Sequence, residues 1–275
     1  MRKLLGIETA GSLSILFSDK TGTITQGILQ PHVFLTGELE SYENYKSVPD
    51  KLQKALKFTI KHSAQSYMDP QGNISGGNST ERAFLGYIDD IKYMSSQEDV
   101  TRIRDILFSS KLKFSAAFIE GSPEIVSELP AIFNDANQVS LIKGAPEILL
   151  SKCNRFVNTE GQIVNFQNSS LVEDEIKYLS SQGTRVIAVA SYSGEFDEEE
   201  GLPDGLIFLG AIGLLDEVRP ESKSAIKTAA DAGIQVVMVT GDRLETAVSI
   251  AEEVGLLENY KSKNFTMNNF RKCAL

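Results

Sequence analysis

The chain has 275 residues, of which 27 are Lys or Arg and 37 are Asp or Glu, so its formal net charge is -10. This acidic balance argues against nucleic acid as a partner, because phosphate binding needs clustered basic side chains. No apolar run approaches the roughly 20 residues of a membrane-spanning helix, and the two cysteines lack metal-ligand spacing. We therefore expect a soluble chain that does not itself insert into a membrane and is long enough for two domain cores.

The first predicted element is a short apolar run at Leu13–Phe17, which is typical of a buried strand and stops at Asp19. The middle of the chain mixes helix and strand signals. We expect helices at 52–62 and 80–92, strands at 116–120, 139–143 and 185–191, and loops at 72–77 and 195–205. The acidic run Glu195–Glu200 in the last of these loops is most simply a solvated segment.

The last part of the chain alternates strand and helix. A strand at Leu206–Ile212 precedes a helix that Pro220 opens and Gly233 ends. A continuous apolar strand follows at Ile234–Val239, of the kind that is buried on both faces of a parallel sheet, and a second helix covers 244–254. This rhythm predicts a doubly wound α/β unit, interrupted by an inserted α+β domain.

The strongest chemical signal is the run DKTGTIT at Asp19–Thr25. A carboxylate at the carboxyl end of a parallel strand lies where open α/β sheets bind ligands. The Gly and Thr residues behind it offer backbone N–H groups and hydroxyls to an anion. Asp19 is therefore a candidate nucleophile for phosphorus. The alternative is an Asp that only ends a strand in a turn, and these cues alone leave both open.

Four further motifs follow DKTGTIT along the chain: NSTE at 78–81, KGAPE at 143–147, DEVRP at 216–220 and TGD at 240–242. In kind and in order, the whole set resembles the P-type ATPases, the cation pumps that form an aspartyl phosphate. The family's hinge motif is Asp-Pro-Pro-Arg, of which this chain keeps Asp216 and Arg219 but neither proline. Its NSTE segment likewise lacks the proline of the family's Asn-Pro-Thr-Glu.

For the two ends of the chain, the resemblance implies a phosphorylation domain with a haloacid-dehalogenase-like parallel sheet, in two parts at 1–28 and 215–275. Asp19 is the implied nucleophile, and its carboxylate and the Thr21 carbonyl are the implied Mg²⁺ ligands. Lys20 and the metal would favour the ionised carboxylate. Hydrolases of the same broad group carry a second Asp where Thr21 stands. Since Thr cannot shuttle that proton, the aspartyl phosphate is expected to persist, as in a pump.

The resemblance also gives roles to the TGD and hinge motifs. Thr240, Gly241 and Asp242 would surround the γ-phosphate and the adjacent nucleotide. Asp216 and Arg219 would touch the ribose or the phosphates. Without the resemblance to the family, the TGD run is explained equally well as a helix N-cap that follows a strand.

The middle of the chain, 29–214, is implied to be a nucleotide-binding domain with an antiparallel sheet. Lys143 would lie in the adenine pocket, with Gly144 letting the ring approach the backbone. Glu81 would accept a hydrogen bond from the adenine amino group. The alternatives are an exposed lysine at a strand end for Lys143 and, for Glu81, a capping-box carboxylate in a helix that Asn78 caps.

Three more residues of the middle domain are implied to contact ATP. Phe108 resembles the family's adenine-stacking Phe, with a core aromatic as the alternative. Lys113 falls at the phosphate-facing position of the same run, although departures at its neighbours leave Lys111 as a substitute. Arg185 resembles the Arg that reaches the β-phosphate, with an exposed edge-strand Arg as the alternative.

The resulting hypothesis is that this chain is the large cytoplasmic region of a P-type cation-transporting ATPase and lies on the cytoplasmic face of a membrane. Its partners would be ATP, Mg²⁺ and the membrane-embedded and actuator domains of the parent protein. The family's Thr-Gly-Asp-Gly-x-Asn-Asp motif is not found, so we expect a truncated phosphorylation domain that binds ATP with little turnover. No Walker-type loop is present. The rival hypotheses are a stand-alone phosphatase with a cap domain and a non-catalytic nucleotide-binding module.

Overall fold

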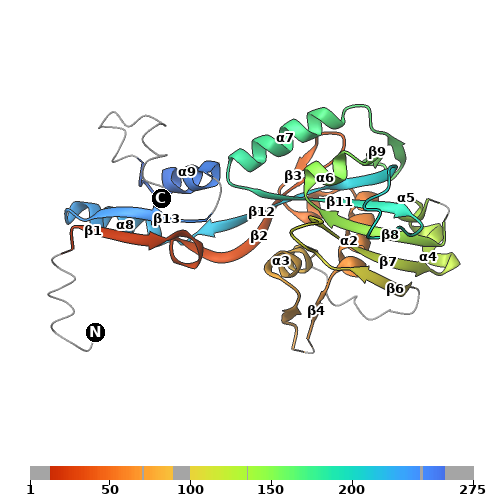
Figure 1. Cartoon of the computed structure of the whole chain (residues 1–275), viewed down its shortest axis with the longest axis horizontal. Coiled ribbons are helices and arrows are strands. Elements are labelled where there is room, and N and C mark those ends of the chain that lie inside the picture. The colour runs from red at the N-terminus through yellow and green to blue at the C-terminus, as the bar shows by residue number, and fades with distance from the viewer. Residues whose placement is uncertain (1–12, 70, 89–99, 135, 242–243, 258–275) are drawn as a thin grey trace. The chain divides into compact units, whose positions relative to one another are not determined.

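The computed structural model describes residues 13–69, 71–88, 100–134, 136–241 and 244–257 (Figure 1). The chain separates into two compact units. The first unit comprises 1–28, 181–183 and 216–275, and the second comprises 29–180 and 184–215. None of the described helices is both long enough and apolar enough to cross a bilayer.

Among the described residues, the second unit is built on a nine-stranded sheet with the order β10-β9-β12-β11-β8-β7-β6, in which β2 also pairs with β12 and β3. Its strands are β2 (Thr25–Leu35), β3 (Ser41–Tyr42), β6 (Val100–Ile106), β7 (Phe114–Gly121), β8 (Gln138–Gly144), β9 (Cys153–Val157), β10 (Ile163–Asn165), β11 (Arg185–Ser193) and β12 (Leu206–Val218). The pairs along β6-β7-β8-β11-β12 are antiparallel, and β12 pairs with β9 in parallel. The predicted antiparallel sheet of the middle region is confirmed.

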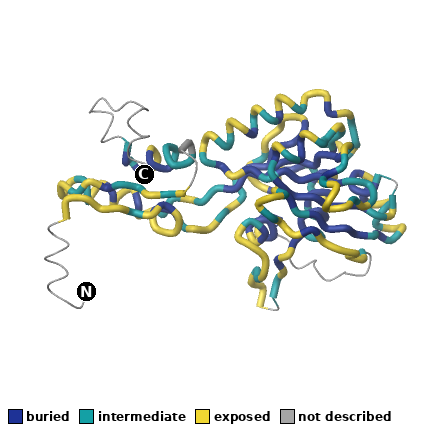
Figure 2. The backbone as a smooth tube through the Cα atoms, in the orientation of Figure 1, coloured by how far each residue is buried: buried dark blue, intermediate teal, exposed yellow. Residues whose placement is uncertain are grey.

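Both faces of this sheet are covered. The helices are α2 (Asp50–Ser63), α3 (Ser79–Tyr87), α4 (Pro123–Glu128), α5 (Pro130–Phe133), α6 (Pro146–Leu150) and α7 (Ser169–Ser181), with a 3₁₀ turn at Tyr45–Ser47. On β8, Leu141 belongs to the core on the α2 and α3 side, whereas its neighbour Ile142 belongs to the core that contains Val172 of α7. This alternation follows from the two-residue period of a strand. Figure 2 shows the sheet as the most buried part of this unit.

A small hairpin lies outside the main sheet. It joins β4 (Ser66–Met68) to β5 (Ile74–Gly76) in antiparallel pairing. The expected loop at 72–77 is therefore partly wrong, because Ile74–Gly76 pairs as a strand. The expected helix at 80–92 ends at Tyr87, and residues 89–92 lie outside the described residues. The loop at 195–205 is confirmed.

The first unit contains a parallel pair of strands, β1 (Ile15–Asp19) and β13 (Gln235–Val239). A helical turn at Lys20–Ile24 follows β1, and the helices are α8 (Ser222–Asp231) and α9 (Leu244–Glu253). A small apolar core joins the turn, α8, β13 and α9 through Ile24, Ile226, Val236 and Ile250. The predicted helix–strand–helix order after residue 220 is observed here, but the strand predicted at 206–212 is part of β12 in the mainly antiparallel sheet of the second unit. The doubly wound α/β unit predicted from this rhythm therefore stays a prediction.

The predicted burial of these two strands is wrong. Phe17 of β1 is 69% exposed, and Val239 of β13 is also mostly exposed. Apolar runs predict strands that have neighbours on both edges and helices on both faces. Among the described residues this sheet has two strands, so much of their apolar surface is open.

Candidate functional site

Asp19 and Thr240 lie side by side at the carboxyl ends of the two parallel strands. In the register of the pair, Asp19 is opposite Val239, the residue just before Thr240. Asp19 is exposed and Thr240 is partly buried. Gly241 follows in an open position where an added Cβ would meet no atom within 4 Å. The third residue of the motif, Asp242, lies outside the described residues.

The turn behind Asp19 is held by specific backbone geometry. Gly22 has a φ of +78°, a left-handed conformation that suits glycine. Lys20 is buried, while Thr21 is exposed. The Thr25 hydroxyl accepts a hydrogen bond from the Gly22 N–H at 3.4 Å, which closes the turn on itself.

Asp216 and Arg219 bind this turn from a distant part of the chain. The Asp216 carboxylate accepts hydrogen bonds from the Thr25 hydroxyl at 2.6 Å and from the Gly27 N–H at 2.8 Å. The Arg219 guanidinium donates to the carbonyls of Gly22 at 2.9 Å and Thr25 at 3.1 Å. Both side chains thus fix the position of the turn behind Asp19. Their expected contact with the nucleotide stays a prediction.

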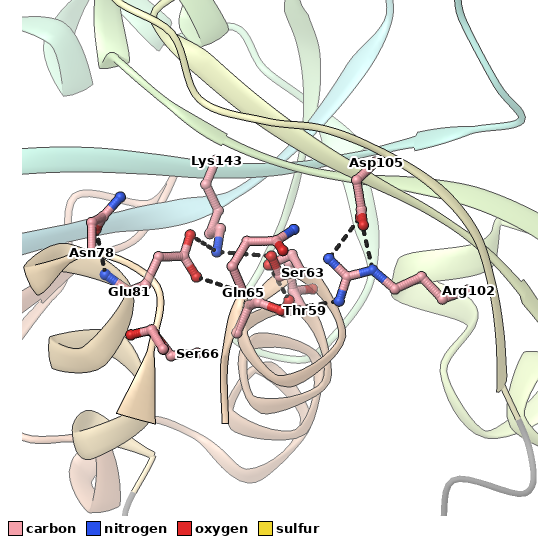
Figure 3. A network of polar contacts seen from close by, with 11 residues as sticks. Thr59, Ser63, Gln65, Ser66, Asn78, Glu81, Arg102, Asp105 and Lys143 are labelled. Carbon is pink, nitrogen blue, oxygen red and sulfur yellow. Dashed lines mark hydrogen bonds and ion pairs between the residues drawn. The ribbon is translucent and has the colours of Figure 1, made fainter. Parts of the chain in front are cut away.

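In the second unit, Lys143 and Glu81 form a buried ion pair (Figure 3). Lys143 Nζ lies 2.7 Å from Glu81 Oε1 and donates a second hydrogen bond to the Ser63 carbonyl at 3.1 Å. The other carboxylate oxygen of Glu81 accepts from the Gln65 N–H at 3.0 Å. Since only 3% of the Lys143 side chain is exposed, its interpretation as an exposed strand-end lysine is wrong.

Burial and the ion pair act on Lys143 in opposite directions. Loss of water around the ammonium lowers the pKa of Lys143, and this effect outweighs the raising effect of Glu81. The capping-box alternative for Glu81 holds only in part. The Asn78 side chain does cap α3 by accepting from the Glu81 N–H at 3.0 Å, but the Glu81 carboxylate turns to Lys143 and Gln65 instead.

The remaining predicted nucleotide residues gather at one end of the sheet. Phe114 and Ala188 are both opposite Gly144 at the end of β8, so Lys113 and Arg185 lie at this end. Strand β6 runs antiparallel to β7 with Ile106 opposite Ala116, which brings its continuation, Phe108, to the same end. Strand register alone therefore collects Phe108, Lys113, Lys143, Gly144 and Arg185 in one region.

The solvent exposure of these residues decides between some of the roles predicted for them from the sequence. Phe108 is 57% exposed, so it is not a core aromatic. Lys113, Lys111 and Arg185 are exposed as well. Gly144 is buried, and an added Cβ would lie 2.7 Å from both the Lys113 carbonyl oxygen and the Phe114 Cβ. Its small size is thus needed by the neighbouring strand, which sequence reasoning did not anticipate.

Three contacts of the site were not predicted from the sequence. The Ser63 carbonyl and the Gln65 N–H are backbone groups that gave no signal. Glu147, which forms an ion pair with Lys113 at 3.6 Å, stands within the KGAPE motif and could have been singled out there.

The described residues contain no group of three or more His, Cys, Asp or Glu side chains that could hold a metal ion. Asp19 offers an exposed carboxylate, and the turn behind it offers backbone carbonyls. Such oxygen donors suit Mg²⁺, which commonly binds through one or two carboxylates and keeps several waters. The donor set therefore fits Mg²⁺ as a partial site.

Comparison with known proteins finds similarity to P-type ATPases along most of this chain. A family model described as "P-type ATPase, cytoplasmic domain N" matches residues 55–221. Calcium-transporting ATPase 1 of Yarrowia lipolytica is 28% identical over 93% of this chain and 29% of its own length. The calcium-transporting ATPase of Bacillus subtilis is 31% identical, covering 94% and 30%. Plasma membrane calcium-transporting ATPase 4 of Bos taurus is 31% identical, covering 94% and 22%. The chain thus spans less than a third of the length of these relatives.

Proposed function

The chain belongs to the P-type ATPase family, and from this membership we propose that it binds ATP in its second unit and is phosphorylated on Asp19 in its first. The observation that carries the proposal is the convergence of Phe108, Lys113 and Arg185 on the sheet end where Lys143 lies. An aromatic face and exposed cations are what a purine and a polyphosphate require.

In this proposal the base stacks on Phe108, beside the buried pair of Lys143 and Glu81. Lys113 and Arg185 hold the phosphates, and Gly144 keeps the strand that carries Lys143 close to Lys113. A chain with a net charge of -10 repels ATP as a whole, so these local cations have to offset that repulsion.

The proposed reaction is phosphoryl transfer on a haloacid-dehalogenase-like parallel sheet. A carboxylate oxygen of Asp19 attacks the γ-phosphorus, the bond to the bridging oxygen breaks, and ADP leaves with the electron pair. The Asp19 carboxylate and the Thr21 carbonyl would hold Mg²⁺, which neutralises charge on the phosphoryl oxygens when bound. Lys20 would supply further positive charge. Thr240, Gly241 and Asp242 would surround the γ-phosphate and the adjacent nucleotide. Asp216 and Arg219 keep the turn behind Asp19 in place.

For the whole protein we propose ATP-driven cation transport across a membrane, with this chain on the cytoplasmic face. The relatives named above are calcium-transporting ATPases, which makes calcium the proposed cargo. The membrane-embedded and actuator domains of such a protein would be its partners.

The test is titration with ATP by calorimetry or amide NMR. Phe108→Ala is the informative variant, because an exposed side chain can be removed without harming the core. Loss of base stacking is expected to weaken ATP about 10-fold, in line with the roughly 1–3 kcal/mol of a stacked base. Leu107→Ala is the matched control, since Leu107 is the adjacent residue and is 64% exposed. Absence of ATP binding, or equal effects of both variants, would contradict the proposal.

A further inference from the structure

Two neighbouring turns at the proposed nucleotide end of the sheet are joined by a backbone hydrogen bond. In the first turn, the Lys113 N–H donates to the Ser109 carbonyl at 2.8 Å, and the Leu112 N–H donates to the Ser109 hydroxyl at 3.2 Å. The second turn begins at Ala145, whose N–H donates to the Lys113 carbonyl at 2.9 Å. The backbone of Lys113 is therefore fixed on both sides.

Lys113 has a strained backbone. Its φ is +60°, a left-handed conformation in which the Cβ of a lysine crowds the following carbonyl. Such strain persists only where the surrounding contacts over-determine it, and it gathers at functional sites. Here the contacts are the two hydrogen bonds and the close approach of Gly144, which leaves no room for a side chain. The structure thus fixes the backbone position from which the Lys113 side chain extends.

The side chain so placed meets a carboxylate of the same chain. Lys113 Nζ lies 3.6 Å from Glu147 Oε1, and both side chains are more than half exposed. Glu147 lies in the first turn of α6, directly after Pro146. An exposed pair of this length is weak and opens easily in water. A polyphosphate, with several charges, can therefore displace the single carboxylate.

We propose that Glu147 is a specificity-determining residue that competes with nucleotide phosphate for Lys113. This inference rests on the proposed function and deepens it. In the free protein the Glu147 carboxylate occupies the place of a phosphate oxygen beside Lys113. On binding, the phosphate takes its place and Glu147 turns to solvent. Glu147 thereby weakens the binding of phosphate-bearing nucleotides and leaves the binding of the nucleoside unchanged.

The experiment compares ATP and adenosine on the full chain with Glu147→Gln. We expect ATP to bind about threefold more tightly, which corresponds to about 0.7 kcal/mol at 1.4 kcal/mol per factor of ten, and adenosine to bind as before. Asp204→Asn is the control for net charge, because it removes one carboxylate from the exposed pair of Lys152 and Asp204. It is expected to leave both affinities unchanged at 0.15 M salt, where distant exposed charges are screened.

The same substitution in a protein that lacks the Lys113 ammonium tests whether Lys113 is the partner of Glu147. In Lys113→Met, the further change Glu147→Gln should no longer strengthen ATP binding. An equal gain with Asp204→Asn, a gain for adenosine, or a gain that persists in Lys113→Met would overturn the inference. ATP binding that is indifferent to Glu147→Gln overturns this inference alone. Failure of the unmodified chain to bind either ligand overturns the proposed function together with it.

Discussion

Lys143 Nζ and Glu81 Oε1 lie 2.7 Å apart, with 3% and 10% of the respective side chains exposed. The two residues come from β8 and from the first turn of α3, so the pair ties a helix to the sheet. Because both charges are buried away from water, each is stabilised by the opposite charge of its partner. The ring of Phe84, 5.7 Å from the Lys143 ammonium, adds a weak attraction on one side.

Removal of one partner of this pair is expected to cost about 3 kcal/mol of unfolding free energy, because an unpaired charge stays buried. Glu81→Gln is the variant, measured by urea unfolding at pH 7. Lys152→Met, which breaks the exposed pair with Asp204, is the control and should cost less than about 1 kcal/mol. The double variant Glu81→Leu with Lys143→Met should be more stable than Glu81→Gln alone. A loss below 1 kcal/mol in Glu81→Gln would show that the pair is open in solution.

The stability of the second unit should fall in mild acid through His62. Burial is the main cause that lowers the pKa of His62 to about 4, with smaller effects from the cations of Lys61 and Arg102. The folded state therefore favours the neutral ring, and the ordinary pKa of His is about 6.5. The stabilisation is complete above about pH 6.5 and is lost as the pH falls toward 4, by up to about 3 kcal/mol.

The measurement is the unfolding free energy from pH 7.5 to 4.5 in the unmodified chain and in His62→Phe. Phenylalanine retains a ring against Phe58, whose centroid lies 4.5 Å away. Carboxylates titrate in both proteins, so the difference between the two pH profiles isolates His62. Parallel profiles would refute the assignment.

The turn behind Asp19 should loosen when Asp216 is replaced by alanine. Two hydrogen bonds to an ionised carboxylate are lost, at about 1.5–3 kcal/mol each, less what water restores. We expect amide exchange at Gly27 to accelerate at least 10-fold. Glu217→Ala is the control, because this neighbouring carboxylate accepts from the side-chain amide of Gln26 at 3.2 Å and removing it also deletes one negative charge. Unchanged exchange at Gly27 together with weaker ATP binding would instead place Asp216 on the nucleotide.

Gly144→Ala should be strongly destabilising, by about 2–3 kcal/mol or more, since the new methyl group meets the Lys113 carbonyl and Phe114 at 2.7 Å. Gly86→Ala is the matched control. Its Cβ would find its nearest atom in Ile74 at 3.7 Å, and in a helix the change to alanine should stabilise by about 0.5–1 kcal/mol. Thermal unfolding of the two variants is sufficient to compare them. Equal melting temperatures would contradict the close approach.

Several elements could be predicted from the sequence because they depend on local pattern. The helix expected at 52–62 is α2 at Asp50–Ser63, and the strand expected at 139–143 is β8 at Gln138–Gly144. Apolar periodicity is enough for such elements. It did not predict how far β1 is buried, because the burial of a strand depends on which other segments cover it.

The contacts of the site depend on register between distant strands, which no local pattern contains. Lys143 and Glu81 are 62 positions apart, and each had an ordinary alternative interpretation. The contacts of Asp216 with Thr25 and Gly27 join positions about 190 apart. The motifs indicated which side chains matter, but only the fold identified their neighbours.

The pairing of β2 with β12 has a consequence for the cost of the insertion. An unstructured loop of this length would burden its host with the entropy of bringing two remote ends together, a cost that grows with the logarithm of the loop length. Here the inserted residues enter along one strand and leave along its neighbour. The folded insertion therefore brings its own two ends together. The residues around Asp19 and Asp216 are then connected as closely as they would be by a short loop. Once the second unit has folded, the two halves of the first unit meet without the closure cost of a long loop.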